Sequence, residues 1–269
     1  MKRIESRNNQ TIKDMIALRD RREREERRLF YFEGVHLLEE YLRAGNTPYA
    51  LFVREDALEK YRELVSGIDC ELYEVTDSVY SKLTEEKAPQ GIFTVSRFLD
   101  NLHFIGSDVS YEDFPHMING ISIMPVDLRD NGNVGTVIRT SAALGCDVLL
   151  CGSCADIYAS KTVRATMGAV FTNEIFVCRD TIGVIKALQS EGRRVIASAL
   201  TDNASLLGGF DINDNDCFLV GNEGQGLTDE VIGQCDMTCI IPMSGRTESL
   251  NAAIAASILL WEAKRGSLT

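Results

Sequence analysis

The chain has 269 residues, of which 45% are hydrophobic and 25% charged, and this composition excludes collagen-like, low-complexity and mainly disordered protein. It holds no apolar run of the roughly 18 residues that cross a bilayer, and its first ten residues lack the apolar core of an export signal. Eight cysteines spread from Cys70 to Cys239 are typical of reduced thiols, so the sequence predicts a cytoplasmic protein with no membrane partner.

The net charge of −12 is unevenly spread along the chain. Residues 1–30 hold ten Lys and Arg against six Asp and Glu, which gives this segment +4 and leaves −16 for the rest. Two interpretations stay open: a solvated helix with ion pairs four residues apart, or an arm that faces RNA. In the second interpretation the RNA-binding side chains are Arg21, Arg22, Arg27 and Arg28.

Up to residue 95 the chain alternates between helical and strand patterns, which predicts a small α/β domain over 1–96. One predicted helix carries Val35, Leu38 and Leu42 on a single face and ends at Gly45. Strands are predicted at 49–53, 70–75 and 91–95, and a second helix at 56–66. Residues 97–118 lose this periodicity and are predicted to form a linker.

The remaining residues, 119–269, predict a second α/β domain with more strongly apolar strands. Near-continuous apolar runs are typical of strands buried on both faces in a parallel sheet covered by helices. The strands are predicted at 120–127, 147–152, 174–178, 194–200, 217–221 and 239–243. The helices are predicted at 133–144, 160–168, 181–190, 228–234 and 248–265.

Three loops of the second domain are richer in Gly, Asn and charge than a plain connection needs, and the first runs from Asp127 to Thr140. Gly135 and Arg139 are four residues apart, so they are expected to share a helical face. A glycine one turn before an arginine leaves room for a ligand near the helix start, where free N–H groups favour a phosphate. A surface arginine on an amphipathic helix is the alternative of equal weight.

The second and third loops also follow apolar strands. Gly221-Asn-Glu-Gly-Gln-Gly226 has three glycines that permit close approach of backbone to a flat ligand, and Glu223 is a candidate acid, base or orienting group. The third loop, 241–251, leads into the last helix, which Ser249 or Glu248 can cap. Asn251 has less structural reason to be there and is therefore a candidate functional residue.

Cysteine chemistry is a minor alternative. Cys151-Gly-Ser-Cys154 has the spacing of a redox pair, which keeps a thiol oxidoreductase open, but it follows a strand and opens no clear helix. Cys235 and Cys239 have no nearby histidine, so no metal site is predicted.

Together, the three loops resemble the signature motifs of the SpoU-type RNA ribose 2′-O-methyltransferases, a branch of the SPOUT superfamily, over Gly120 to Arg265. The matching stretches are Asn133-x-Gly-x-x-x-Arg139-Thr140, Leu219-Val-Gly-Asn-Glu-Gly-Gln-Gly-Leu227 and Ile241-Pro-Met-x-Gly-x-x-x-Ser-Leu-Asn251. Residues 1–95 resemble, on softer cues such as FYFEGVHLLEE and APQGIFTV, the substrate-binding domain that often precedes this module. Ser141 and Ala252 are small departures, since Ala and Val are usual at these positions.

The resemblance implies a parallel α/β sheet with a C-terminal trefoil knot, a homodimer, and S-adenosylmethionine as cofactor. The implied cofactor-binding residues are Leu219, Gly221, Asn222, Gly226, Ile241, Met243 and Leu250. The implied reaction is methyl transfer to a ribose 2′-hydroxyl of structured RNA, with ribosomal RNA favoured over transfer RNA. The alternative is a non-catalytic RNA-binding or ribosome-assembly factor with the same fold.

The resemblance also assigns roles within the site. Arg139 is the implied centre of catalysis, and we expect it to hold a phosphate and stabilise the developing alkoxide, because a guanidinium keeps its proton. Action of Arg139 as a base would need a strong local perturbation. The other implied catalytic residues, which would orient the hydroxyl and hold the loops, are Asn133, Glu223, Ser249 and Asn251.

Overall fold

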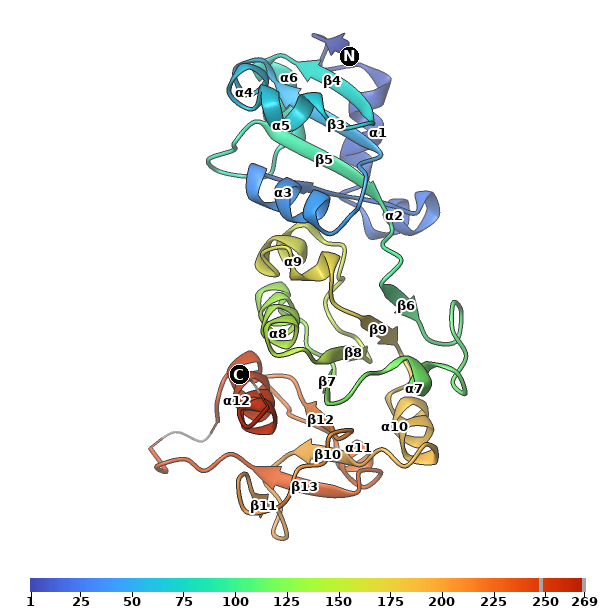
Figure 1. Ribbon diagram of the computed structural model, residues 1–269, viewed down its shortest axis with the longest axis vertical. Helices are drawn as coiled ribbons and strands as arrows, with labels where there is room; N and C mark the ends of the chain where they lie inside the picture. Colours follow the sequence, from blue (N-terminus) through green and yellow to red (C-terminus); the bar gives the residue numbers. More distant parts are fainter. Residues whose placement is uncertain (247–248, 268–269) are drawn as a thin grey trace. The chain divides into compact units, whose positions relative to one another are not determined.

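The computed structural model describes residues 1–246 and 249–267, which form two compact units (Figure 1). Unit 1 comprises Met1–Leu99 together with Asp156–Phe171, and unit 2 comprises the two remaining stretches, Asp100–Ala155 and Thr172–Thr269. Residues 156–171 therefore belong to unit 1 although their neighbours in the chain belong to unit 2. Most of the predicted linker, from residue 100 onward, lies in unit 2 and contains a strand and a helix.

Unit 1 is built on a five-stranded sheet of order β1-β4-β3-β5-β2, in which β5 runs antiparallel to its two neighbours and the other pairings are parallel. The strands are β1 (Lys2–Ile4), β2 (Leu29–Glu33), β3 (Ala50–Arg54), β4 (Glu71–Val75) and β5 (Ile92–Arg97). The helices are α1 (Gln10–Ala17), α2 (Arg21–Arg27), α3 (Val35–Arg43), α4 (Glu55–Lys60), α5 (Arg62–Ser66), α6 (Asp77–Leu83) and α9 (Ser160–Ala165), followed by the 3-10 turn η1 (Ala169–Phe171).

The three strands predicted before residue 96 are confirmed as β3, β4 and β5, while β1 and β2 were not predicted. The helix predicted over 56–66 is two helices, because Tyr61 leaves the helical conformation with φ −113° and ψ 27°.

Strand β2 is buried on both faces, because successive side chains of a strand point to opposite sides. Tyr31 packs into the core beneath α1 and α6. Phe30 and Phe32 face the other way, where their rings lie 4.5 Å from Tyr158 and 5.1 Å from Phe171. Residues 156–171 thus supply the aromatic cover for one face of this sheet, which explains why they belong to unit 1.

Unit 2 contains an eight-stranded sheet of order β11-β13-β10-β12-β7-β8-β9-β6, in which all the strand pairings are parallel. The strands are β6 (Leu102–Phe104), β7 (Ser122–Pro125), β8 (Asp147–Cys151), β9 (Ile175–Cys178), β10 (Val195–Ser198), β11 (Ser205–Leu206), β12 (Cys217–Val220) and β13 (Met237–Ile240). The helices are α7 (Phe114–Met117), α8 (Asn131–Leu144), α10 (Thr181–Ser190), α11 (Asp229–Ile232) and α12 (Ala252–Lys264). The predicted α/β class with a parallel sheet is confirmed.

Helices cover both faces of this sheet. On one face α12 packs against α8, β12 and β7. On the other face, side chains of α7, α10 and α11 join a core that includes Met124, Leu149 and Leu219 from the strands. The carboxyl ends of parallel strands share one edge, so the loops after β7, β12 and β13 all leave the same edge of the sheet.

The trefoil knot implied by the resemblance stays a prediction.

Within residues 1–246 and 249–267, no helix is long and apolar enough to cross a membrane.

Candidate active site

The first polar loop leaves β7 through Asp127, which has an unusual backbone conformation for a residue other than glycine, with φ +54°. Its carboxylate accepts a hydrogen bond of 2.6 Å from the Ser153 N–H. A Cβ at Gly152 would lie 2.5 Å from the same carboxylate oxygen, so this close approach requires glycine. Asp130 then caps α8 by accepting from the Asn133 N–H at 2.8 Å. The loop is therefore held at both ends.

The second loop folds back on itself after β12. The Asn222 side-chain oxygen accepts from the N–H groups of Gly224 and Gln225 at 2.9 and 2.8 Å, and the Gly226 N–H donates to the Asn222 carbonyl at 3.0 Å. A Cβ on Gly221 would lie 2.2 Å from the Gly226 carbonyl carbon, which no side chain can accept. The Asn222 oxygen thus shapes the loop, while Glu223 stands exposed at the tip.

Hydrogen bonds between side chains join all three loops. Asn133 donates through Nδ2 to the Glu223 carboxylate, and Asn251 donates through Nδ2 to Asn133 Oδ1 at 3.1 Å. These residues come from α8, from the loop after β12 and from the start of α12. The predicted grouping of Asn133, Glu223 and Asn251 is thereby seen as a continuous chain of contacts.

Asn251 has a structural role that the sequence analysis missed. It is the N-cap of α12, and its Oδ1 accepts from the N–H groups of Ala253 at 2.9 Å and Ile254 at 3.2 Å. The helix begins at Ala252 rather than at 248, so Ser249 precedes it and does not cap it. Ser249 is exposed and makes no hydrogen bond within the described part of the chain, and Glu248 lies outside the described residues.

Arg139 projects from α8 as an exposed side chain, and it has no carboxylate partner within residues 1–246 and 249–267. Gly135 is buried and Arg139 is exposed, and the expectation that Gly135 leaves room for a ligand stays a prediction. Exposed Gly132 and half-buried Thr136 precede Arg139 on the solvent-facing side of α8. The Thr136 hydroxyl donates to the Gly132 carbonyl at 2.8 Å.

The predicted cofactor-binding residues differ in what they can present to a ligand. Leu219 is fully buried in the sheet core, so only its backbone could be reached. Ile241 and Leu250 are half-buried and Met243 is 38% exposed, which leaves three apolar side chains near the ends of the third loop. Gly221 and Gly226 offer backbone groups without side chains. The predicted cofactor-binding residues therefore offer a ligand both polar backbone groups and apolar side chains.

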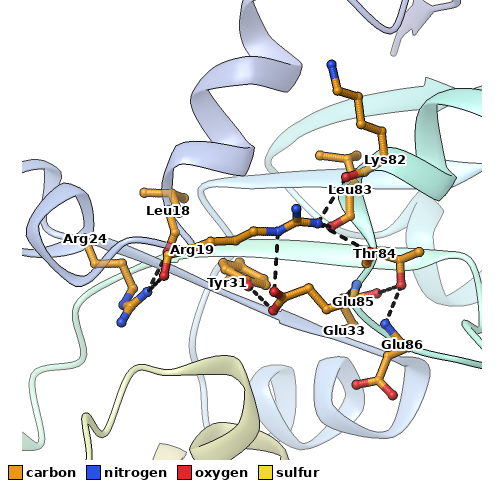
Figure 2. Close-up of polar contacts among 10 residues, drawn as sticks. All are labelled: Leu18, Arg19, Arg24, Tyr31, Glu33, Lys82, Leu83, Thr84, Glu85 and Glu86. Atoms are coloured by element: carbon orange, nitrogen blue, oxygen red, sulfur yellow. Dashed lines mark hydrogen bonds and ion pairs between the residues drawn. The ribbon is translucent and has the colours of Figure 1, made fainter.

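The basic segment of unit 1 uses two of its arginines internally (Figure 2). Arg19 donates to the carbonyls of Lys82, Leu83 and Thr84, which caps the end of α6. Arg24 is only 5% exposed and donates to the Leu18 and Arg19 carbonyls and to Asp156.

The four arginines predicted to contact RNA divide into two pairs. Arg21 forms an ion pair with Glu25 at 2.7 Å, and Arg27 forms one with Glu23 at 2.9 Å. Arg22 and Arg28 are exposed and have no carboxylate partner in the part of the chain that the structure describes. The Arg28 guanidinium lies 4.8 Å from the centre of the Phe98 ring. The ion pairs expected of a solvated helix are therefore present at Arg21 and Arg27, and the contact of this segment with RNA stays a prediction.

The cysteine pair is poorly suited to redox chemistry. Burial raises the pKa of the Cys154 thiol to about 12, and it raises the pKa of the fully buried Cys151 thiol well above its ordinary value. Since the thiolate is the reactive form, neither residue is activated. No group of three or more His, Cys, Asp or Glu side chains among the described residues could hold a metal ion.

Comparisons with known proteins show the family to which the chain belongs. The family model described as the SpoU rRNA methylase family matches residues 120–261, and that of an MRM3-like substrate binding domain matches residues 9–94. A 23S rRNA (guanosine(2553)-2′-O)-methyltransferase of Bacillus subtilis is 31% identical over 97% of this chain and 98% of its own. A tRNA (guanosine(18)-2′-O)-methyltransferase of Escherichia coli is 31% identical over 49% of this chain and 58% of its own. The structure of an AdoMet-bound rRNA methyltransferase from Sinorhizobium meliloti is 29% identical, with a TM-score of 0.85 over 100% of this chain and 99% of the other.

Two substitutions separate the capping role of Asn251 from its contact with Asn133. We expect Asn251→Ala to lower the free energy of unfolding by about 1 kcal/mol, because α12 loses its cap. Asn251→Asp keeps the accepting oxygen and adds a favourable charge at the helix start, so its stability should match the wild type. Urea denaturation measures both. Equal losses for the two variants would contradict this separation.

Proposed function

The chain belongs to the SpoU rRNA methylase family, and from this premise we propose that it transfers a methyl group from S-adenosylmethionine to a ribose 2′-hydroxyl of ribosomal RNA. The choice of ribosomal RNA rests on coverage. The relative named for 23S rRNA matches both units of this chain, whereas the relative named for tRNA matches only about half of it.

All eight cysteines are free, which supports the predicted cytoplasmic location.

The observation that carries the proposal is the hydrogen-bonded chain from Glu223 through Asn133 to Asn251. Arg139, six residues after Asn133 on α8, is exposed and has no carboxylate partner in the described part of the chain. The hydrogen bonds connect three segments that the resemblance identified as separate motifs, and Arg139 is available to bind substrate. A non-catalytic RNA-binding protein would need no such polar chain between the loops.

The residues present fit S-adenosylmethionine. The turn from Gly221 to Gly226 brings backbone groups together without side chains, and Ile241, Met243 and Leu250 provide apolar contacts for a flat ring. These residues, with the backbone of Leu219, would hold the cofactor. When bound, it supplies a methyl group made electrophilic by the neighbouring sulfonium.

The remaining task of the protein is to position the alcohol. With the cofactor bound, the ribose oxygen would take the methyl group while the electron pair of the broken carbon–sulfur bond stays on sulfur, and the hydroxyl proton would pass to solvent. Alignment of the two reactants therefore supplies much of the acceleration. Arg139 holds the neighbouring phosphate and stabilises the oxygen as it gains negative charge. Asn133, Glu223 and Asn251 hold the loops together, and exposed Ser249 helps to orient the hydroxyl.

The outer face of α12 supports a homodimer. Ile254 is 49% exposed and Trp261, seven residues later on the same face, is 55% exposed, with half-buried Ile258 between them. The opposite face of the helix is already buried in unit 2 through Ala256, Leu259 and other apolar side chains. A helix that is apolar all round is usually covered on every side, and a second copy of this chain is the proposed cover.

Replacement of Arg139 tests its role in the reaction. We expect Arg139→Ala to reduce methyl transfer by roughly 10²–10³-fold or more, because the charge that stabilises the oxygen is removed. Affinity for S-adenosylmethionine should stay within a few-fold, since the proposed cofactor residues all follow residue 216. Calorimetry and a tritium-transfer assay give the two quantities. Loss of cofactor binding in a folded variant would show that the assigned role is wrong.

A charge on the outer face of α12 tests the dimer. We expect Trp261→Glu to shift the molar mass measured by light scattering from twice the 29.8 kDa of the chain to that of one chain. The conservative variant Trp261→Phe should remain a dimer. A Trp261→Glu variant that stays dimeric, with an unchanged circular dichroism spectrum, would move the proposed interface elsewhere.

Paired and unpaired arginines of unit 1 give a matched test of RNA binding. We expect Arg22→Gln with Arg28→Gln to weaken RNA binding and to lower its salt slope by about one for each phosphate that the protein no longer neutralises. Arg21→Gln with Arg27→Gln removes the same charge from residues that already have carboxylate partners, so its effect should be smaller. Filter binding at several salt concentrations measures both. Identical effects would show that only the total charge of the segment matters.

A further inference from the structure

Unit 2 is strongly acidic, although the proposed substrate is a polyanion. It carries nine Lys and Arg against twenty Asp and Glu, a net charge of −11. Several of its cations are already engaged: Arg193 donates to the carbonyls of Gly120 and Ile118, and Arg194 forms an ion pair with Asp216. RNA can approach this unit only where arginines remain free.

Free arginines occur at the carboxyl edge of the sheet. Arg129 follows β7 and Arg179 follows β9, and both are exposed without a carboxylate partner among residues 1–246 and 249–267. Acidic side chains next to them in the chain are bound to backbone N–H groups instead. Asp130 accepts from Asn133 at 2.8 Å, and Asp180 accepts from the Gly183 N–H at 2.9 Å.

The register of the strands puts these two arginines close together. Val126 pairs with Cys151, and Cys151 pairs with Cys178, so the residues that follow them leave the sheet side by side. Neighbouring strands are about 4.8 Å apart, so the backbones after β7 and β9 are separated by about 10 Å. In a duplex the phosphates of one strand follow one another at about 3.4 Å along the helix axis, so side chains about 10 Å apart do not share one phosphate. Arg129 and Arg179 can therefore contact different phosphates.

The arginines at the opposite edge of the sheet, where the strands begin, are already engaged. Arg193 and Arg194 directly precede β10; Arg193 donates to the Gly120 and Ile118 carbonyls, and Arg194 pairs with the fully buried Asp216. The exposed arginines Arg129 and Arg179 instead lie at the edge that also carries the three motif loops.

We propose that Arg129 and Arg179 hold two phosphates of the substrate strand and so position it along the carboxyl edge of β7, β8 and β9 for Arg139. The inference rests on the proposed function and extends its binding surface beyond the three motifs. Both side chains are exposed and have no carboxylate partner in the described ranges, so they contribute little to the stability of the fold. Their neutralisation should affect substrate binding alone.

The test uses the full-length protein, unmodified 23S ribosomal RNA made by transcription, and S-adenosylmethionine with a tritiated methyl group. The variants are Arg129→Gln and Arg179→Gln, singly and together, and Arg179→Lys, which keeps the charge. Lys186→Gln is the matched control, because Lys186 is an exposed cation of unit 2 without a carboxylate partner in the described ranges. Lys186 lies on α10 five residues after the helix begins, which places it about 7 Å along the helix axis from the edge of the sheet where α10 starts.

We expect the double variant to raise KM for RNA roughly tenfold and to lower the salt slope of RNA binding by about two, with kcat nearly unchanged. Arg179→Lys should retain most of the wild-type slope, and Lys186→Gln should resemble the wild type. Affinity for the cofactor should be the same in all variants.

Two results would overturn the inference. Either the double variant binds RNA with the wild-type KM and salt slope, or Lys186→Gln lowers the slope as much as Arg179→Gln does. The proposed function fails separately, if wild-type protein that binds RNA and cofactor transfers no methyl group. In that case the salt slopes from filter binding still decide whether Arg129 and Arg179 contact RNA.

Discussion

The direction of the hydrogen bonds at the site is imposed by the start of α12. A side-chain amide has one accepting oxygen and one donating NH₂ group, and a helix start needs an acceptor. Because the Asn251 oxygen caps α12, its NH₂ group must face outward, where it meets the Asn133 oxygen. The Asn133 NH₂ group is then left to face Glu223, and only an acceptor can complete the chain. A helix cap thereby sets the orientation of three distant loops.

The contact between Asn251 and Asn133 depends on where α12 packs against the sheet. Strand β13 is separated from β7 by β10 and β12, yet α12 packs against α8 and β7. The burial of Ala256, Leu259 and Leu260 stabilises that position, and the Thr140 and Ser257 hydroxyls lie 3.2 Å apart between the two helices. Asn251 meets Asn133 because the whole helix is held by apolar contacts, not because the loops attract one another.

The sequence predicted those parts of the fold that local patterns determine. Apolar runs located the six strands predicted in unit 2, and α10 begins and ends where it was predicted. The membership of residues 156–171 in unit 1 was not predictable, since it depends on contacts of Tyr158 and Phe171 with residues more than 120 positions away. Likewise, the three motifs identified Asn251 as important, but its capping role depended on a helix start that the pattern placed too early.

The net charge of the chain was a poor guide to RNA binding, because binding depends on local contacts that a sum over the sequence ignores. Interactions between exposed charges are largely screened beyond about 8 Å at physiological salt, so a phosphate responds mainly to its nearest neighbours. At the carboxyl edge, Asp130 and Asp180 cap α8 and α10, where the positive end of each helix partly compensates their charge. Arg129 and Arg179 are thus less opposed than a count of charges implies. An acidic domain can bind a polyanion where its carboxylates are engaged by backbone and its guanidinium groups are not.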